Sequence, residues 1–409
     1  MSWVLALNLI AIISYLIFAY HLGFPRNIHE TLFYAQDSKE YKEMGDWLFF
    51  FSSARCSDIR PWLFPFLVHL FSLLGGDHGI WFMNFILYLL ALNFIYSSVL
   101  RSCNRSFAIV TFFILLANVS LIEMTFHALT EIPTFFLLSV MVWFFSKKYF
   151  VSDEPYFWKG LLFLSSLLAL IKPVFSIFLY LAIFCFIIRA FKDPLLRKVR
   201  NLFIMAILLI PVFIQLTIMT VGFGKFSIST IGSRTFREYY YSKFFADENH
   251  IAFSFSKGPS DTDLVVIKTA IAKMQEGEMI RSVLSQPVRA LNIYEDILGL
   301  NLRSGSSLMD GEKYPELVAW SINTNLFYLR LHELMMFVLP IILILLRKKK
   351  EVLFISLLLF IPLLLIFSTS GISFWQGDRL ILPALPLWIT LYSLQIFNGY
   401  SYLKKMRKE

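Results

Sequence analysis

The sequence is poor in charge and in cysteine. Of its 409 residues, 16% are charged and three are cysteine, whereas 57% are hydrophobic and 44 are phenylalanine. A soluble domain of this size needs more polar surface than that to stay out of aggregates. The composition therefore excludes an ordinary soluble protein and predicts that lipid surrounds most of the chain.

Several motifs of soluble enzymes are missing as well. The sequence has no alternation of strands and helices and no glycine-rich phosphate loop, which excludes a nucleotide-sugar site of the soluble kind. It has no metal-binding cluster of His and Cys, and its seven histidines are scattered. The first apolar run, 3–20, lacks a basic start and a small-residue cleavage site. We therefore expect a retained helix there and not a signal peptide.

Long apolar runs dominate the chain. A membrane-spanning helix needs about 20 apolar residues, so we expect an all-α, polytopic membrane protein with about ten transmembrane helices. The runs are 3–20, 80–100, 106–123, 130–146, 156–171, 173–189, 201–221, 327–346, 352–368 and 380–397. An eleventh run, 61–74, is short, contains Pro65 and ends at Gly75 and Gly76. We expect this run to be re-entrant or juxtamembrane.

The basic residues orient these helices. The formal net charge is +9, and Lys and Arg are concentrated around 101–105, 147–148, 189–200, 347–350 and 404–408. This is the pattern of cytoplasmic membrane loops and predicts no nucleic-acid partner. With a cytoplasmic N-terminus, and with 61–74 not spanning, all of these clusters lie inside. The composition favours a location in a bacterial plasma (inner) membrane and does not exclude the membrane of the endoplasmic reticulum.

The topology divides the chain into three parts. Residues 1–221 form an N-terminal transmembrane module with a first outer loop at 21–79, residues 222–326 form a large second outer loop, and residues 327–409 form C-terminal helices and a basic tail. Apolar residues at helical spacing predict amphipathic helices on the membrane around 41–51 and 264–274. The cysteines at 56, 103 and 185 fall outside, inside and within the bilayer, so we expect no structural disulfide.

Charged residues stand at five helix ends on the predicted outer side. Each has a simpler explanation when taken alone: Asp37 could cap a helix, Arg60 could reach lipid head groups, and Glu131 could favour a helix start. Five such sites on a side with few other charges favour convergence on a polar cavity. The candidates are Asp37, Asp58, Arg60, His127, Glu131, Lys172, Asp378 and Arg379.

The order of the motifs resembles the C-type integral membrane glycosyltransferases. They are Asp-Ser-x-x-Tyr at 37–41, Arg-Pro-x-x-x-Pro at 60–65, Thr-Glu at 130–131, Lys-Pro at 172–173 and Arg-Leu-x-x-Pro-x-x-Pro at 379–386. That superfamily includes protein O-mannosyltransferases, the aminoarabinose transferases of lipid A and many bacterial surface-polysaccharide enzymes. The agreement is best over residues 1–190.

The resemblance implies transfer of a sugar from a polyprenyl-phosphate donor to an acceptor hydroxyl on a glycan, a lipid or a protein at the outer face. It implies that Asp37 is the catalytic base or lies beside it, that Glu131 is a second acid, and that Arg60, Lys172 and Arg379 hold the carrier phosphate. Asp58, His127 and Asp378 are further candidates for binding the substrate. Single displacement would invert the anomeric centre.

Metal dependence stays open, because several members of the superfamily have a paired Asp-Glu in the first loop where this chain has Asp37 followed by Ser38. No other cofactor is expected. Two further functions fit parts of the pattern. A lipid-linked sugar transporter or flippase would also have intramembrane charges and broken helices, and a polysaccharide polymerase or ligase would share the carrier. The charges gather at outer helix ends and the two halves show no repeat, which favours the transferase.

Overall fold

The computed structural model describes most of the chain. The described residues are 2–22, 24, 27–50, 58–146, 155–251, 262–303, 305–306, 308, 312–328, 330, 350–373 and 376–406. Their regular secondary structure is entirely helical, with no strand in these ranges. The all-α class is therefore confirmed. Cys103 and Cys185 are free thiols, and Cys56 lies outside the described ranges.

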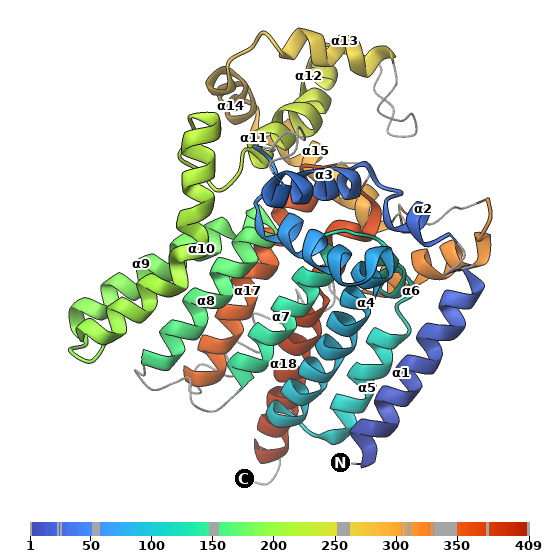
Figure 1. Cartoon of the computed structure of the whole chain (residues 1–409), viewed down its shortest axis with the longest axis vertical. Coiled ribbons are helices and arrows are strands. Elements are labelled where there is room, and N and C mark those ends of the chain that lie inside the picture. Colours follow the sequence, from blue (N-terminus) through green and yellow to red (C-terminus); the bar gives the residue numbers. More distant parts are fainter. Residues whose placement is uncertain are drawn as a thin grey trace.

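Most of the apolar helices lie side by side in a bundle, with both chain termini at the same end (Figure 1). The helices of this bundle are α1 (Ser2–His21), α4 (Leu63–Ser102), α5 (Arg105–Leu116), α7 (Glu131–Ser146), α8 (Pro155–Ile171), α9 (Ser176–Lys192), α10 (Val199–Phe223), α17 (Lys350–Ser370) and α18 (Leu385–Met406). The short elements between them are α2 (Ile28–Leu32), α6 (Val119–Glu123), η1 (Met124–Phe126), η3 (Pro173–Phe175), η5 (Gly377–Leu380) and η6 (Leu382–Ala384).

Among the described residues, four helices are long and apolar enough to cross a membrane: 3–21, 63–102, 173–192 and 199–223. The pair α5 and 119–126, bent by 65°, would make a fifth. The ten expected spans are therefore not confirmed. Two of the expected spans are the 16-residue α7 and the 17-residue α8, which rise about 24–26 Å, short of a hydrocarbon core of about 30 Å. Most of the run 327–346 lies outside the described residues.

The apolar stretch 63–102 is broken where the sequence has two glycines. Gly75 and Gly76 have non-helical backbone angles, and Gly76 has a φ of 60°, which glycine adopts at little cost. A helix of 63–74 alone rises about 18 Å, too little to cross the hydrocarbon core. In Figure 1 the first half of α4 lies across the bundle and the second half runs along it.

Helix α3 (Gln36–Phe50) packs on that first half of α4. The predicted amphipathic helix is present, but Tyr41 of its apolar stripe is buried by protein and meets the ring of Phe64 with centroids 4.7 Å apart. At Gly45 the two backbones approach so closely that an added Cβ would lie 2.6 Å from the carbonyl oxygen of Pro65. A glycine at this position therefore sets the distance between the two segments.

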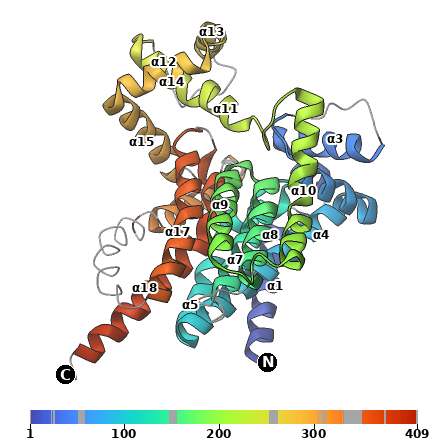
Figure 2. The ribbon, with the colours of Figure 1, turned by 90° about the vertical axis from the view of Figure 1, so that its left-hand side faces the viewer.

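The described helices within 231–303 lie above the bundle (Figure 2), and all of them except the first contribute residues to a small core. They are α11 (Ile231–Thr235), the π-helix η4 (Phe236–Tyr241), α12 (Ser242–Glu248), α13 (Thr262–Ile271), α14 (Glu276–Ser285) and α15 (Pro287–Arg303). The predicted stripe at 264–274 does not face lipid at Ile271, because this residue is buried in one cluster with Tyr241 and Phe244.

The close approach at Gly45 gives a test of the fold. Gly45→Ala should destabilise the protein by about 1–3 kcal/mol, because the new methyl group must push α3 away from Pro65. Thermal unfolding in detergent measures the effect. Gly277→Ala in α14 is the control, since nothing lies within 4 Å of its added Cβ. Equal melting temperatures for the two variants would show that the α3–α4 contact is loose.

Candidate functional site

Five of the eight sequence candidates lie at ends of helices and are held there by local sequence. Asp37 is in the first turn of α3, Glu131 is the first residue of α7, and Arg379 lies in η5. Arg60 and Lys172 each precede a proline, which disfavours helical angles at the residue before it. The backbone of Lys172 is accordingly extended, so this residue separates α8 from η3.

Arg379 links η5 to the starts of α3 and α7. Its Nη2 donates to Oδ2 of Asp37 at 2.5 Å, and its Nε donates to Oε1 of Glu131 at 2.9 Å. The side chain of Glu131 is 2% exposed and that of Arg379 is 11% exposed. One guanidinium thus bridges carboxylates that are 94 positions apart in the sequence, at the starts of α3 and α7.

Arg60 holds the other oxygen of Asp37. Its Nη2 donates to Oδ1 of Asp37 at 2.6 Å, and its Nε and Nη2 each donate to Oε2 of Glu40 at 3.1 Å. Its Nη1 donates to the hydroxyl of Tyr41 at 3.3 Å. Arg60 is only 7% exposed. The simpler explanations are therefore wrong for these residues: Arg60 does not reach head groups, and both oxygens of Asp37 accept from arginines.

Lys172 completes the charge network. Its Nζ lies 3.6 Å from Oε1 of Glu131, and neither this Nζ nor Oε2 of Glu131 has a hydrogen-bond partner among the described residues. The network contains three cations, Arg60, Lys172 and Arg379, together with the carboxylates of Asp37, Glu40 and Glu131. The formal charge of the six side chains is therefore zero.

The electrostatics of the network fix the charge of Asp37. Burial alone would raise the pKa of this carboxyl, but the guanidinium groups of Arg379 and Arg60 outweigh it and lower the pKa to about 2. Burial also lowers the pKa of Lys172, and the nearby Glu131 opposes that effect. Asp37 is consequently ionised at any physiological pH.

Three candidates do not join this network. Asp58 accepts from Thr230 at 2.6 Å and from Lys225 at 3.1 Å. The backbone carbonyls of Asp58 and Ile59 also accept hydrogen bonds from Thr230 and Ser229. Asp58 thereby attaches the chain that leads from α10 to α11 to the segment that ends at Arg60.

His127 and Asp378 belong to a second buried polar cluster. His127 Nε2 lies 2.5 Å from Oε1 of Glu123, and Oε2 of Glu123 accepts from Ser306 at 2.7 Å. Asp378 accepts from Asn325 at 2.9 Å and from Ser321 at 3.3 Å. Ser321 also accepts from the backbone N–H of Ser306, so the two carboxylates are linked.

Some members of these clusters were missed by sequence reasoning. Glu40 lies three residues after Asp37 and so on the same helical face, a spacing that could have identified it. Glu123 and Ser306 carry no such signal, because they are 183 positions apart and their meeting depends on the tertiary fold.

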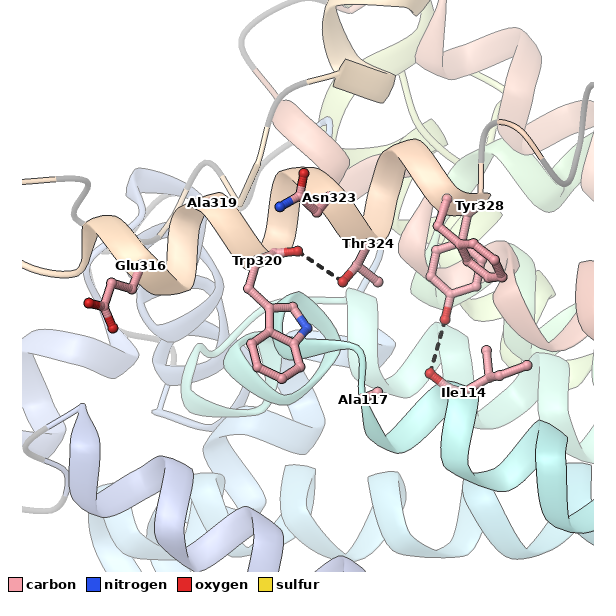
Figure 3. Close-up of a pocket in the computed structure, with 9 residues that line it drawn as sticks. Ile114, Ala117, Glu316, Ala319, Trp320, Asn323, Thr324 and Tyr328 are labelled. Carbon is pink, nitrogen blue, oxygen red and sulfur yellow. Dashed lines mark hydrogen bonds between the residues drawn. The ribbon is translucent and has the colours of Figure 1, made fainter.

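An apolar groove of about 610 Å³ lies elsewhere, between the helix 315–328 and the end of α5 (Figure 3). Trp320 and Phe327 line it, and Tyr328 closes it by donating to the carbonyl of Ile114 at 3.1 Å. Tyr328 also borders a smaller hollow beside Asp378. Neither hollow is lined by a residue of the charge network.

The chemistry of the network fits an anion better than a metal. Arginines occupy both oxygens of Asp37, and cations lie next to every carboxylate in the network. Among the described ranges no group of three or more His, Cys, Asp or Glu is arranged to hold a metal ion.

No family model matches the chain, and no curated protein or solved structure matches it.

Asp378 gives a test of the second cluster. Its burial raises the pKa to about 6 from 3.8. Because the folded protein holds this proton more tightly, its contribution favours folding below pH 4 and is lost as pH rises through 6, by roughly 3 kcal/mol. Asp378→Asn should therefore gain stability relative to wild type as the pH rises from 4 to 7. Melting temperatures in detergent measure this gain, with the exposed Asp296→Asn as control. Parallel curves for wild type and Asp378→Asn would contradict the assignment.

Proposed function

We propose that this protein is a membrane glycosyltransferase that transfers a sugar from a polyprenyl-phosphate carrier to an acceptor hydroxyl. The observation that carries the proposal is the buried network in which Arg60, Arg379 and Lys172 surround the carboxylates of Asp37 and Glu131. Such a concentration of buried charge carries a desolvation cost, and groups with strongly shifted pKa values cluster at functional sites.

The cations supply what a lipid-phosphate donor needs. The arginines present donors in a planar fork that matches phosphate oxygens, and the lysine offers a compact charge. The Nζ of Lys172 has no hydrogen-bond partner among the described residues, so its protons are available to a ligand oxygen. Donors fixed in a buried site stabilise the charge that develops on a departing phosphate.

The carboxylates supply the base. In the proposed reaction the acceptor oxygen attacks the anomeric carbon while Asp37 takes the hydroxyl proton. The bond between the anomeric carbon and the phosphate oxygen breaks, its electron pair stays on that oxygen, and polyprenyl phosphate leaves between the cations. Glu131 holds Arg379 and Lys172 in place. This single displacement inverts the anomeric centre.

We further propose ten spans, with the charge network at the outer face of a plasma membrane. The positive-inside pattern of the basic clusters supports this topology. An even number of spans also fits the two termini, which lie at one end of the bundle (Figures 1 and 2). The short helices α7 and α8 are then spans that lie mostly within protein. Most residues of α7 are buried, so few of its side chains have to match the thickness of the lipid.

Cysteine labelling tests the topology. Ser106 and Ser285 are both exposed and lie at the start of α5 and the end of α14. In a background without Cys56, Cys103 and Cys185, Ser285→Cys should react with an impermeant maleimide on intact cells, and Ser106→Cys only after the membrane is opened. Labelling of Ser106→Cys in intact cells would reverse the proposed orientation.

The catalytic reading is tested by Asp37→Asn. Asn keeps the shape of the side chain but cannot serve as a base, so sugar transfer or hydrolysis should fall about 100-fold to 10,000-fold. The assay incubates purified protein in nanodiscs with radiolabelled polyprenyl-phosphate hexose or aminopentose and measures sugar release from the lipid. The exposed Glu43→Gln on the same helix is the control and should keep wild-type activity.

Glu131→Gln separates the two acids. Loss of activity in this variant, with Asp37→Asn still active, would move the base to Glu131. Wild-type rates in both variants would show that neither carboxylate is the catalytic base and would contradict the proposed transferase mechanism. Movement of the lipid-linked sugar across the bilayer without cleavage would identify a flippase instead.

A further inference from the structure

We propose that, in the ligand-free protein, the carboxylate of Asp37 occupies the binding position of the donor phosphate. When the donor binds, its phosphate displaces Asp37 from Arg60 and Arg379, and Asp37 can then act as the base. The inference rests on the proposed function and deepens it, because it names the ligand group, its position and the order of events. Three observations on the network support it.

The first observation is that the two arginines share one pattern of contacts. In each, the Nε donates to an acid other than Asp37: Glu40 for Arg60 and Glu131 for Arg379. In each, the Nη2 donates to Asp37, at 2.6 and 2.5 Å. The Nε contacts, together with a second contact from Nη2 of Arg60 to Glu40, anchor the guanidinium groups, and both Nη2 atoms converge on the carboxylate of Asp37.

The second observation concerns what can replace that carboxylate. Asp37 offers one oxygen to each arginine, and two oxygens of a phosphate can accept from the same two Nη2 groups. The anchors on Glu40 and Glu131 need not move during such an exchange. The Nζ of Lys172, 3.6 Å from Glu131 and without a hydrogen-bond partner among the described residues, is a third donor for the incoming group.

The third observation is the neutrality of the network. Its three cations and three carboxylates cancel, so a phosphodiester adds one uncompensated negative charge. Asp37 then loses two cationic neighbours and gains an anionic one, and both changes raise its pKa from about 2. A carboxylate paired with two arginines is a weak base. After the exchange it can accept the acceptor's proton.

The exchange has a kinetic consequence. A hydroxyl that enters the site before the donor finds no effective base, so the donor must bind first. Once Asp37 has taken the proton it is neutral and no longer competes for the arginines. Transfer of that proton to water restores the carboxylate, which returns to Arg60 and Arg379 and displaces the polyprenyl phosphate product.

Binding of polyprenyl phosphate in nanodiscs tests the exchange, with the uncharged polyprenol as reference ligand. Asp37→Asn should bind polyprenyl phosphate about tenfold more tightly than wild type, because the internal competitor is gone. Glu40→Gln is the matched control: it removes the same charge from Arg60 but leaves Asp37 on both Nη2 groups. Its gain should stay within about threefold. Equal gains in both variants would show a general charge effect and overturn the exchange.

A second measurement uses the wild-type protein and does not depend on the folding of a variant. Carbodiimide labelling of Asp37, mapped by mass spectrometry, should increase on addition of polyprenyl phosphate and not of polyprenol, since the carboxylate leaves its arginines. Unchanged or reduced labelling while the phosphate binds would overturn the proposed exchange but would not contradict the proposed transferase activity. Absence of polyprenyl phosphate binding in wild type and variants would overturn the proposed function itself.

Discussion

The end of the bundle that holds the charge network depends on the contacts of one guanidinium group, that of Arg379. A charge buried to this extent must be paired, and removal of one partner from a buried pair typically costs about 3–5 kcal/mol. Arg379 is satisfied only if α3 brings Asp37 and α7 brings Glu131 to the same point. The close approach of α3 to α4 at Gly45 and the attachment of Asp58 to Thr230 serve this requirement, because they position Asp37 and Arg60.

Two consecutive residues of η5 connect the charge network to the second polar cluster. Arg379 donates hydrogen bonds to Asp37 and Glu131, whereas Asp378 accepts hydrogen bonds from Asn325 and Ser321. The preceding Gly377 has a φ of 57°, a conformation that side chains disfavour. This short turn therefore contacts the start of α3, the start of α7 and the helix 315–328.

Much of this arrangement could be predicted from local sequence, and the remainder could not. Composition and apolar runs predicted an all-helical membrane protein, and Gly75 and Gly76 marked the break in α4. Polar residues at helix ends identified five members of the charge network. Sequence could not predict which candidates meet: Asp58 and Arg60 are two residues apart, yet one contacts Thr230 and the other contacts Asp37. Such pairings are decided by tertiary packing. The ten expected spans are not confirmed among the described residues, in part because α7 and α8 are short.

The zero net charge of the network also determines how it responds to its surroundings. A membrane surface rich in anionic lipid sets up a potential of tens of millivolts, and this potential acts on charged groups near the interface. A group of three cations and three carboxylates experiences opposite forces that cancel in the sum. At the proposed interfacial position, the electrostatic energy of the network as a whole is therefore independent of the mean potential, and hence of changes in lipid composition and in membrane voltage. Only the binding of an additional ion makes the centre sensitive to either.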